Sequence, residues 1–231
     1  NAITGIATAF MDSIPMVVIS GQVQSHLIGT DAFQETDMIG ISRPIVKHSF
    51  TVDHQSNIPR IVKEAFYVAT SGRQGPVVID VPKDLTNPDD LFDFNYPDEA
   101  NIRSYNPPIK PEENQIDRVI EALKNSKRPV IYAGGGTIAS NASNELREFN
   151  SYIKAPVTNT LMGLGVYPGT DKYFLGMLGM HGTFQANMAM HNADLILAVG
   201  ARFDDRITNT PEKFAPRAQI VHFDVDHSSV S

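Results

Sequence analysis

The chain has 231 residues, of which 42% are hydrophobic and 19% charged, and it contains no cysteine. This composition is typical of soluble globular proteins, and the length suffices for one large domain or two ordinary ones. The formal net charge is −7 and the 19 Lys and Arg residues do not cluster, which disfavours nucleic-acid-binding proteins, because they need a basic face to neutralise phosphates.

Several further features restrict the class of protein. Without cysteine there are no disulfide bonds and no thiolate metal sites, which fits a cytoplasmic protein. The apolar runs are too short to span a bilayer and no signal peptide is visible, so we expect no membrane association. The chain starts at Asn1 rather than Met and opens directly in a helical pattern, so we expect a fragment of a longer polypeptide.

In the first half, apolar spacing and turn residues predict alternating helices and strands. They are a helix over 3–13, a strand over 16–19, a short helix over 31–35, a helix over 57–72 and a strand over 76–83. Asp31 is the expected cap of the short helix, which carries Phe33 and Gln34, and Asn57 is the expected cap of the long one. A strand, helix and strand in this order predict a right-handed parallel unit.

Between residues 87 and 111 the chain is rich in proline, Asp and Asn and shows no periodicity, which indicates a linker between domains. We therefore predict a first domain over 1–90, a linker over 91–110 and a second domain over 111–231. The second half predicts helices over 114–123, 144–153 and 184–192 and strands over 129–133, 156–160, 195–199 and 219–226. The fold class predicted for both domains is α/β, with parallel sheets covered by helices on both faces and the second sheet doubly wound.

Four predicted strands of the second domain end in glycine or polar residues, at Gly134–Gly136, Thr160–Leu161, Gly200–Asp204 and Asp224. Carboxyl ends of parallel strands share one edge of a sheet, where ligands bind, so the four ends together favour a nucleotide-like cofactor over four unrelated turns. Taken singly, each has a plainer reading. The glycines at 134–136 fit a tight turn as well as a phosphate cradle, His181 fits a structural role, and Asp224 fits a solvated strand end.

The first domain offers Phe33 and Gln34, which could hold a heteroaromatic cofactor or a keto acid, although on these two residues alone a core Phe beside a surface Gln is the favoured explanation. No carboxylate pair or Ser/His/Asp set can be assembled from the sequence. The seven histidines show no ligand spacing, so we predict no metal site within this chain.

Six stretches of the chain, in order, resemble one family. They are Gln22 with Gly-Thr-Asp-Ala-Phe-Gln-Glu at 29–35, Lys47-His48, the run from Thr70 to Asp84, Thr-Leu-Met-Gly-Leu-Gly at 160–165, Leu-Gly-Met-His-Gly-Thr at 178–183, and Gly-Ala-Arg-Phe-Asp-Asp-Arg at 200–206. The first three resemble the pyrimidine-binding domain of the acetohydroxyacid synthase (acetolactate synthase) family, and the last three resemble its middle, FAD-binding domain. The last stretch is the most specific, because related thiamine-diphosphate enzymes without flavin are not expected to carry it.

The resemblance implies an enzyme that condenses two pyruvates, or pyruvate and 2-ketobutyrate, with loss of carbon dioxide. This is the first common step towards valine, leucine and isoleucine. Thiamine diphosphate, bound through Mg²⁺, supplies the nucleophile, and FAD has no required redox role. The family's catalytic large subunit forms homodimers or homotetramers and works with a small regulatory subunit.

The resemblance also assigns residues by position. Gln34 would approach thiamine diphosphate, and the substrate or its channel would be lined by Phe33, Lys47, Lys83 and Arg206. FAD would be held by Arg73, Gly135, Thr160, Leu161, Leu178, Gly179, Met180, His181, Gly200, Ala201, Arg202, Phe203, Asp204, Asp224 and Val225.

Two positions depart from the family and two parts are missing. Gln24 stands where proline is frequent and His26 where arginine is, both at the expected channel mouth. The family's activating glutamate precedes the matching region, and its Gly-Asp-Gly metal motif does not occur here. We therefore expect this chain to be inactive alone. The residues by themselves also allow a non-catalytic nucleotide-binding module or a structural domain that binds nothing.

Overall fold

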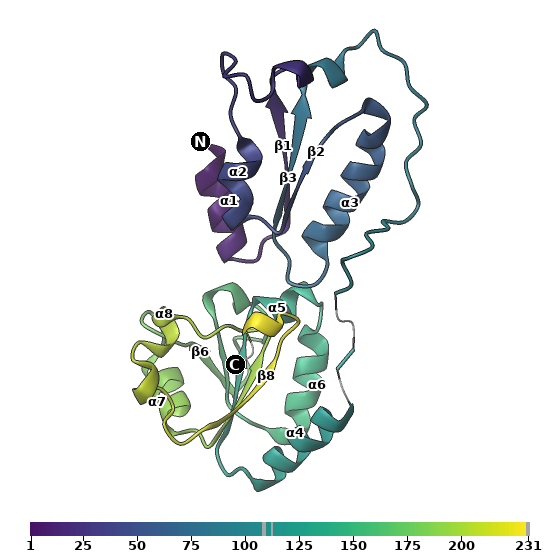
Figure 1. Ribbon diagram of the computed structural model, residues 1–231. Helices are drawn as coiled ribbons and strands as arrows, with labels where there is room; N and C mark the ends of the chain where they lie inside the picture. Colours follow the sequence, from purple (N-terminus) through teal and green to yellow (C-terminus); the bar gives the residue numbers. More distant parts are fainter. Residues whose placement is uncertain (108–109, 112, 230–231) are drawn as a thin grey trace. The chain divides into compact units, whose positions relative to one another are not determined.

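The computed structural model describes residues 1–107, 110–111 and 113–229 (Figure 1). The chain divides into two compact units, Asn1–Pro107 and Pro108–Ser231. Each unit contains its own parallel sheet, which agrees with the α/β class that the sequence predicts.

Unit 1 is built on a three-stranded parallel sheet in the order β1-β3-β2. Its strands are β1 (Met16–Gln22), β2 (His48–Thr51) and β3 (Pro76–Pro82). The helices are α1 (Ala2–Met11), α2 (Met38–Ser42) and α3 (Ile58–Thr70), with short 3-10 turns at Ser25–Leu27, Arg43–Ile45, Gln55–Asn57 and Lys83–Thr86. In Figure 1, α1 and α2 lie on one side of this sheet and α3 on the other.

Alternation along the central strand β3 gives unit 1 two apolar layers. Val77 and Ile79 pack against α3, while Val78 packs with Ile6 of α1. A strand covered on both faces must be apolar on both faces, which explains the continuous apolar run that predicts it.

Two sequence-based expectations for unit 1 are wrong. Residues 31–35 form a turn instead of the short helix that Asp31 was expected to cap. Asn57 precedes α3, but its side chain donates to Asp53 Oδ1 over 2.7 Å and makes no capping bond to the helix. Strand β2, whose sequence is His-Ser-Phe-Thr, was not predicted.

Part of the expected linker belongs to unit 1. Leu91 and Phe94 are exposed, but Ile102 and Tyr105 pack against the apolar layer beneath α3. The Tyr105 hydroxyl also donates to the Ser71 carbonyl over 3.0 Å. Residues 91–110 are therefore not a free linker throughout.

Unit 2 is built on a five-stranded parallel sheet in the order β6-β5-β4-β7-β8. The strands are β4 (Pro129–Ala133), β5 (Val157–Asn159), β6 (Phe174–Met177), β7 (Leu195–Val199) and β8 (Gln219–Phe223). The helices are α4 (Glu113–Asn125), α5 (Gly135–Ala139), α6 (Ser143–Ile153), α7 (Phe184–Asn192) and α8 (Asp205–Thr208), with 3-10 turns at Leu161–Gly163, Pro211–Lys213 and His227–Ser229.

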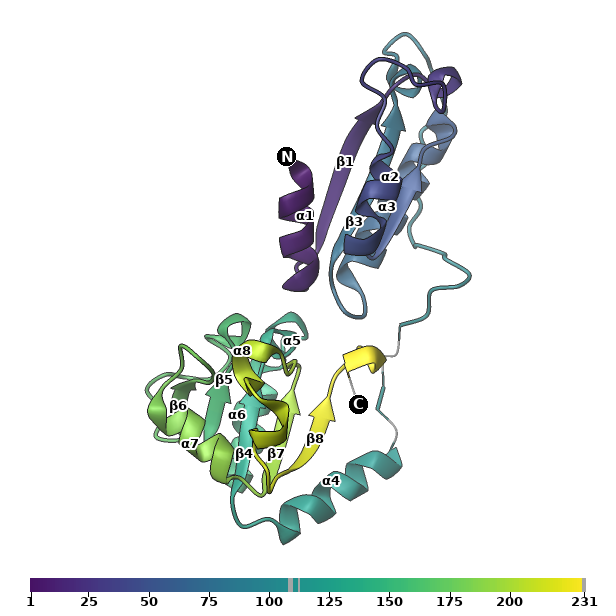
Figure 2. The ribbon, with the colours of Figure 1, turned by 60° about the vertical axis from the view of Figure 1, so that its left-hand side comes forward.

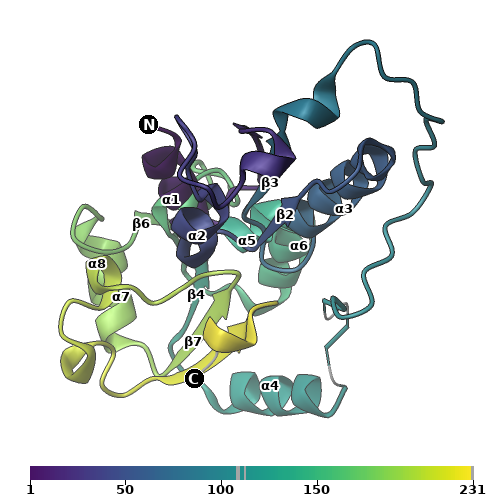
Figure 3. The same cartoon turned by 45° about the horizontal axis from the view of Figure 1, so that its top comes forward.

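Helices cover both faces of the unit 2 sheet, as Figure 2 and Figure 3 show from two directions. Leu146 of α6 packs on one face with partly buried residues of α4, and Met190 of α7 packs on the other. The chain starts at the central strand β4, steps outward to β6, then crosses to β7 and β8. This is a doubly wound sheet, as predicted, and its order reverses between β4 and β7.

The predicted helix over 184–192 and strand over 195–199 coincide with α7 and β7. Strand β6 was not predicted, and β8 ends at Phe223 rather than at residue 226. Within the described part of the chain, no helix combines the length and apolar character needed to span a membrane.

Candidate functional site

The glycines that follow β4 and β7 in unit 2 pack directly against each other. A Cβ added to Gly134 would lie 2.2 Å from the Gly200 carbonyl oxygen, and one added to Gly136 would lie 2.8 Å from the Gly200 Cα. The Gly136 amide donates to the Gly200 carbonyl over 3.0 Å, and the Gly134 amide donates to the Val199 carbonyl over 2.9 Å. At the point where the strand order reverses, the sheet edge is therefore built of backbone.

Residues 134–136 were expected to form either a tight turn or a phosphate cradle, and the structure gives their glycines a role in packing the two strand ends. Gly135 begins the short helix α5, and the amides of Gly134 and Gly136 are already bonded within the protein. The glycines act by allowing close approach of two chain segments, which only a residue without Cβ permits.

The turn after β5 continues the same edge. A Cβ on Gly163 would lie 2.5 Å from the Ala133 carbonyl oxygen. The Thr160 hydroxyl accepts the Gly163 amide over 2.9 Å, which leaves Leu161 exposed on the outside of the turn. Thr160, Leu161 and Gly135 thus lie around one backbone-lined edge, as expected.

The loop over 178–183 adjoins the segment that carries Arg206. The Met180 amide donates to the Arg206 carbonyl over 3.0 Å. Asn187 of α7 binds Gly179 through two hydrogen bonds. Its Oδ1 accepts the Gly179 amide over 3.2 Å, and its Nδ2 donates to the Gly179 carbonyl over 3.1 Å. Leu178 and Gly179 are buried, whereas Met180 and His181 are exposed. The Arg206 side chain is 71% exposed and lies 3.8 Å from Asp205.

The residues after Gly200 divide between the edge and the core. Ala201 is buried, and the Arg202 carbonyl accepts the hydroxyl of buried Tyr132 over 3.2 Å. The half-buried Phe203 ring packs against the core, with its centroid 5.4 Å from that of Tyr132. Asp204 caps α8, accepting the amides at 206 and 207 over 3.1 and 3.2 Å. Phe203 and the Asp204 carboxylate therefore have structural partners that the sequence did not indicate.

Asp224, which follows β8, is joined to the end of β7 through His222. His222 Nε2 lies 2.7 Å from the Ala201 carbonyl oxygen and 3.4 Å from Asp224 Oδ2. The hydrogen bond to Asp224 raises the pKa of His222 above its ordinary value, and burial opposes that rise only partly. Burial pushes the pKa of Asp224 upward, but the bonds from His222 and the Asp226 amide outweigh it, so this pKa lies below its ordinary value. The sequence missed His222, which holds an ionised carboxylate at the edge. Val225 follows and is exposed.

In unit 1, Phe33 and Gln34 lie on the loop between β1 and α2. The Phe33 side chain is 89% exposed, and Gln34 has a left-handed backbone with φ of 64°. The alternative explanation of Phe33 as a core residue is therefore wrong, and its ring is exposed.

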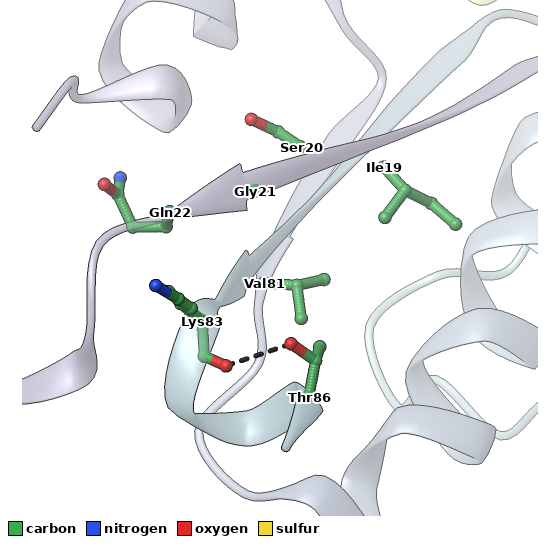
Figure 4. A pocket seen from close by; sticks show the side chains of 7 residues that line it. All are labelled: Ile19, Ser20, Gly21, Gln22, Val81, Lys83 and Thr86. Atoms are coloured by element: carbon green, nitrogen blue, oxygen red, sulfur yellow. Dashed lines mark hydrogen bonds between the residues drawn. The ribbon is translucent and has the colours of Figure 1, made fainter. Parts of the chain in front are cut away.

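Gln22 and Lys83 line a hollow of about 410 Å³ at the ends of β1 and β3 (Figure 4). Gln22 Nε2 donates to the Thr36 carbonyl over 2.7 Å and to Asp80 Oδ2 over 3.1 Å. Asp80 is only 4% exposed and burial raises its pKa, although bonds from Gln22 and Ser20 oppose the rise. The sequence assigned no role to this buried carboxyl.

Lys47 and Arg73 lie at the opposite, amino edge of the unit 1 sheet. Lys47 Nζ donates to the Ser71 carbonyl over 2.6 Å, to the Tyr105 hydroxyl over 2.9 Å and also to the Val68 carbonyl. Arg73 Nε donates to Ser13 Oγ over 3.0 Å. Within unit 1 the structure does not bring these two cations together with Gln34 and Lys83. Lys47 instead satisfies carbonyls at the C-terminal end of α3.

The two positions that depart from the resembling family lie directly after β1. Gln24 precedes the 3-10 turn Ser25–Leu27, which contains His26. Ser25 is fixed by Asp84, which accepts the Ser25 amide over 2.8 Å and its hydroxyl over 3.1 Å. Among the described residues, no group of three or more His, Asp or Glu side chains is arranged to hold a metal ion.

Comparisons with known proteins give the family. Residues 116–231 match the model described as "Thiamine pyrophosphate enzyme, central domain", and residues 1–41 match "Thiamine pyrophosphate enzyme, N-terminal TPP binding domain". The whole chain is 55% identical to the acetolactate synthase large subunit of Haemophilus influenzae and 60% identical to that of Buchnera aphidicola from Acyrthosiphon pisum. It is 54% identical to the acetolactate synthase isozyme 3 large subunit of Escherichia coli. The chain spans 40% of the length of each of these relatives. It therefore belongs to the thiamine pyrophosphate enzyme family and is a homologue of acetolactate synthase large subunits.

Proposed function

We propose that this chain is part of an acetolactate synthase large subunit, which condenses two 2-keto acids with loss of carbon dioxide. The substrates would be two pyruvates, or pyruvate and 2-ketobutyrate, and the products would feed branched-chain amino acid synthesis. The observation that carries the proposal is the 55% and 60% identity to acetolactate synthase large subunits over the whole chain.

Unit 2 is the proposed binding site of FAD. The proposal is supported by the edge where β4, β5 and β7 end, at which Gly134, Gly163 and Gly200 bring backbone against backbone, since ligands bind at this edge of a parallel sheet and small residues let them approach the backbone. The ionised Asp224 suits ribose hydroxyls. Thr160, Leu161, Met180 and the turn beginning at Gly200 would contact the remainder of the cofactor. Phe203 and Asp204 would support the site from behind, given their structural partners.

Unit 1 is proposed to contribute Gln34 and Phe33 to the thiamine diphosphate site. When bound, this cofactor supplies a carbon nucleophile for the condensation. An exposed ring and a neighbouring amide can pack on and hydrogen-bond to a heteroaromatic group. We propose that the activating glutamate and the Mg²⁺ site lie outside these 231 residues, which contain no Gly-Asp-Gly motif.

Two cations are proposed to receive the substrate carboxylates. Lys83 lines the hollow in unit 1, and Arg206 exposes its guanidinium in unit 2. A planar guanidinium can bind a carboxylate through two hydrogen bonds. Lys47 and Arg73, by contrast, are proposed to stabilise unit 1.

The relatives' names support further proposals about the whole protein. The words "large subunit" favour assembly with a small regulatory subunit, and we propose a homodimer or homotetramer of the large subunit in the cytoplasm.

The test uses the full-length protein that contains this chain. The purified protein is incubated with pyruvate, thiamine diphosphate, Mg²⁺ and FAD, and acetolactate is measured after its conversion to acetoin. We expect product, and yellow flavin absorbance that co-elutes with the protein. Pyruvate consumption without acetolactate would refute the proposed reaction, and binding of NAD or ADP in preference to FAD would refute the flavin site. The 231-residue chain alone is expected to form no product.

A further inference from the structure

The segment over 29–35 has an unusual backbone, because two of its left-handed residues, Asp31 and Gln34, are not glycine. Gly29, Asp31 and Gln34 all have left-handed conformations, with φ of 85°, 58° and 64°. Residues other than glycine adopt this region at an energetic cost, and such strain persists only where surrounding contacts impose it. Because Phe33 is 89% exposed, side-chain packing does not impose the conformation.

The contact that does so is the Glu35 carboxylate. One of its oxygens accepts the Gly29 amide and the other accepts the Ala32 amide over 3.0 Å. Several backbone N–H groups that converge on one anion form a stable arrangement, and bonds to an ionised acceptor are stronger than neutral ones. These bonds, that from Gly29 foremost, also hold the pKa of Glu35 below its ordinary value.

The other hydrogen bonds of this segment do not span it. The Glu35 amide donates to the Ala32 carbonyl over 3.0 Å, and the Thr30 hydroxyl donates to the Leu27 carbonyl over 2.7 Å. Gln22 holds the following residue, Thr36, and so fixes where the loop ends. Among the bonds described for residues 29–35, the one from the Gly29 amide to the Glu35 carboxylate joins the two ends of the segment. We call the segment 29–35, closed in this way, the arch.

We propose that Glu35 is a positioning residue, whose ionised carboxylate folds the segment 29–35 around itself and thereby presents Phe33 and Gln34 to thiamine diphosphate and the 2-keto acid. This inference rests on the proposed function for its ligands, but the fold of the arch is independent of it. Glu35 itself touches neither reactant. Its role is to keep two exposed neighbours in one conformation, so that binding does not have to order them.

The test compares Glu35→Gln with Glu121→Gln in the full-length protein. Glu121 is exposed on α4, so Glu121→Gln makes the same chemical change at a carboxylate outside the segment 29–35. Gln keeps the size of Glu but carries no charge, and its NH₂ group cannot accept an amide. Two quantities are measured, namely hydrogen exchange of the peptide over 29–35 by mass spectrometry, and steady-state kinetics with thiamine diphosphate and pyruvate varied.

For Glu35→Gln we expect exchange of this peptide to accelerate about tenfold, as for loss of one charge-assisted hydrogen bond. We also expect the KM values for thiamine diphosphate and pyruvate to rise about tenfold, with Tm lowered by no more than about 2 °C. Unchanged exchange over 29–35 would overturn the proposal, as would faster exchange with unaltered KM values. If the unmutated protein forms no acetolactate, the proposed function fails while exchange still decides whether Glu35 holds the arch.

Discussion

Replacement of Gly134 by alanine should destabilise unit 2 strongly, although the backbone conformation of Gly134 is open to any residue. Its φ is −115° and its ψ is −175°, so alanine introduces no torsional strain. The added Cβ would however lie 2.2 Å from the Gly200 carbonyl oxygen and 2.6 Å from the Ala201 Cα. Both neighbours are backbone atoms and cannot rotate away, so the ends of β4 and β7 must separate.

The size of the effect follows from what that separation disrupts. Forced overpacking costs about 1–3 kcal/mol, and the two inter-strand bonds made by the Gly134 and Gly136 amides contribute about 1 kcal/mol each. Reduced freedom of the unfolded chain returns about 0.5 kcal/mol. We therefore expect Gly134→Ala to lower the free energy of unfolding by about 2.5–4.5 kcal/mol, summed from these terms.

The matched control is Gly169→Ala. A Cβ at Gly169 would meet Phe174 at 4.0 Å, an ordinary contact, so we expect a change within about 0.5 kcal/mol. Urea unfolding of the full-length protein, followed by circular dichroism, measures both variants, and co-eluting flavin absorbance reports the proposed FAD site. If Gly134→Ala unfolds at the same urea concentration as the control and retains flavin, the argument from close backbone approach is wrong.

Three further changes test the contacts around the two units. Lys47→Met should lower stability by about 1–3 kcal/mol in thermal unfolding, because it removes the ammonium donor from the Val68 carbonyl and one of two donors from the Ser71 carbonyl. Buried Asn150 of α6 donates to the Tyr167 hydroxyl and accepts the Ala155 amide. Asn150→Leu should lower the free energy of unfolding in urea by about 2–4 kcal/mol, since it leaves that hydroxyl and that amide buried without this partner. The stabilisation that follows from the raised pKa of His222 should be fully present below its ordinary value of 6.5 and be lost as the pH rises through the folded-state value. Unfolding free energies measured between pH 6 and pH 9 (roughly the window of the His titration) should decline, and His222→Gln should remove that part of the decline. The lowered pKa of Asp224 acts in the opposite sense, so its contribution is lost towards acid.

Sequence reasoning located the elements whose residues carry their own pattern. The apolar spacing of α3 and the five apolar residues of β7 are local properties, and both elements lie where they were predicted. Strands β2 and β6 have no such pattern, since one reads His-Ser-Phe-Thr and the other contains Gly176 with φ of 88°. Strand β2 is extended because it pairs with β3, and β6 because it pairs with β5. Neither partner is adjacent in the sequence, so a local pattern cannot reveal the pairing.

The convergence of strand ends in unit 2 could also be predicted from the sequence. Strand ends of a parallel sheet converge whatever their side chains, so Gly134, Thr160 and Gly200 were correctly expected at one edge. Which side chains are free at that edge depends on tertiary partners. The sequence does not reveal that Tyr132 packs against Phe203 or that tertiary carbonyls bind the Lys47 ammonium.

The two units hold their candidate ligand-binding loops by opposite means, and the difference has consequences for variation. In unit 1, carboxylates of Glu35 and Asp84 accept backbone amides of an exposed loop, so the loop should tolerate changes of size and respond to loss of charge. In unit 2, glycines bring backbone against backbone at Gly134 and Gly200, so a Cβ added at either of these two positions should be harmful. A scan that substitutes each loop residue by alanine should therefore find Glu35 and Asp84 sensitive in unit 1, and Gly134 and Gly200 sensitive in unit 2. The side chains of Phe33 and Arg206 are exposed and do not hold these loops in place. Their replacement should therefore reduce ligand binding while stability is retained.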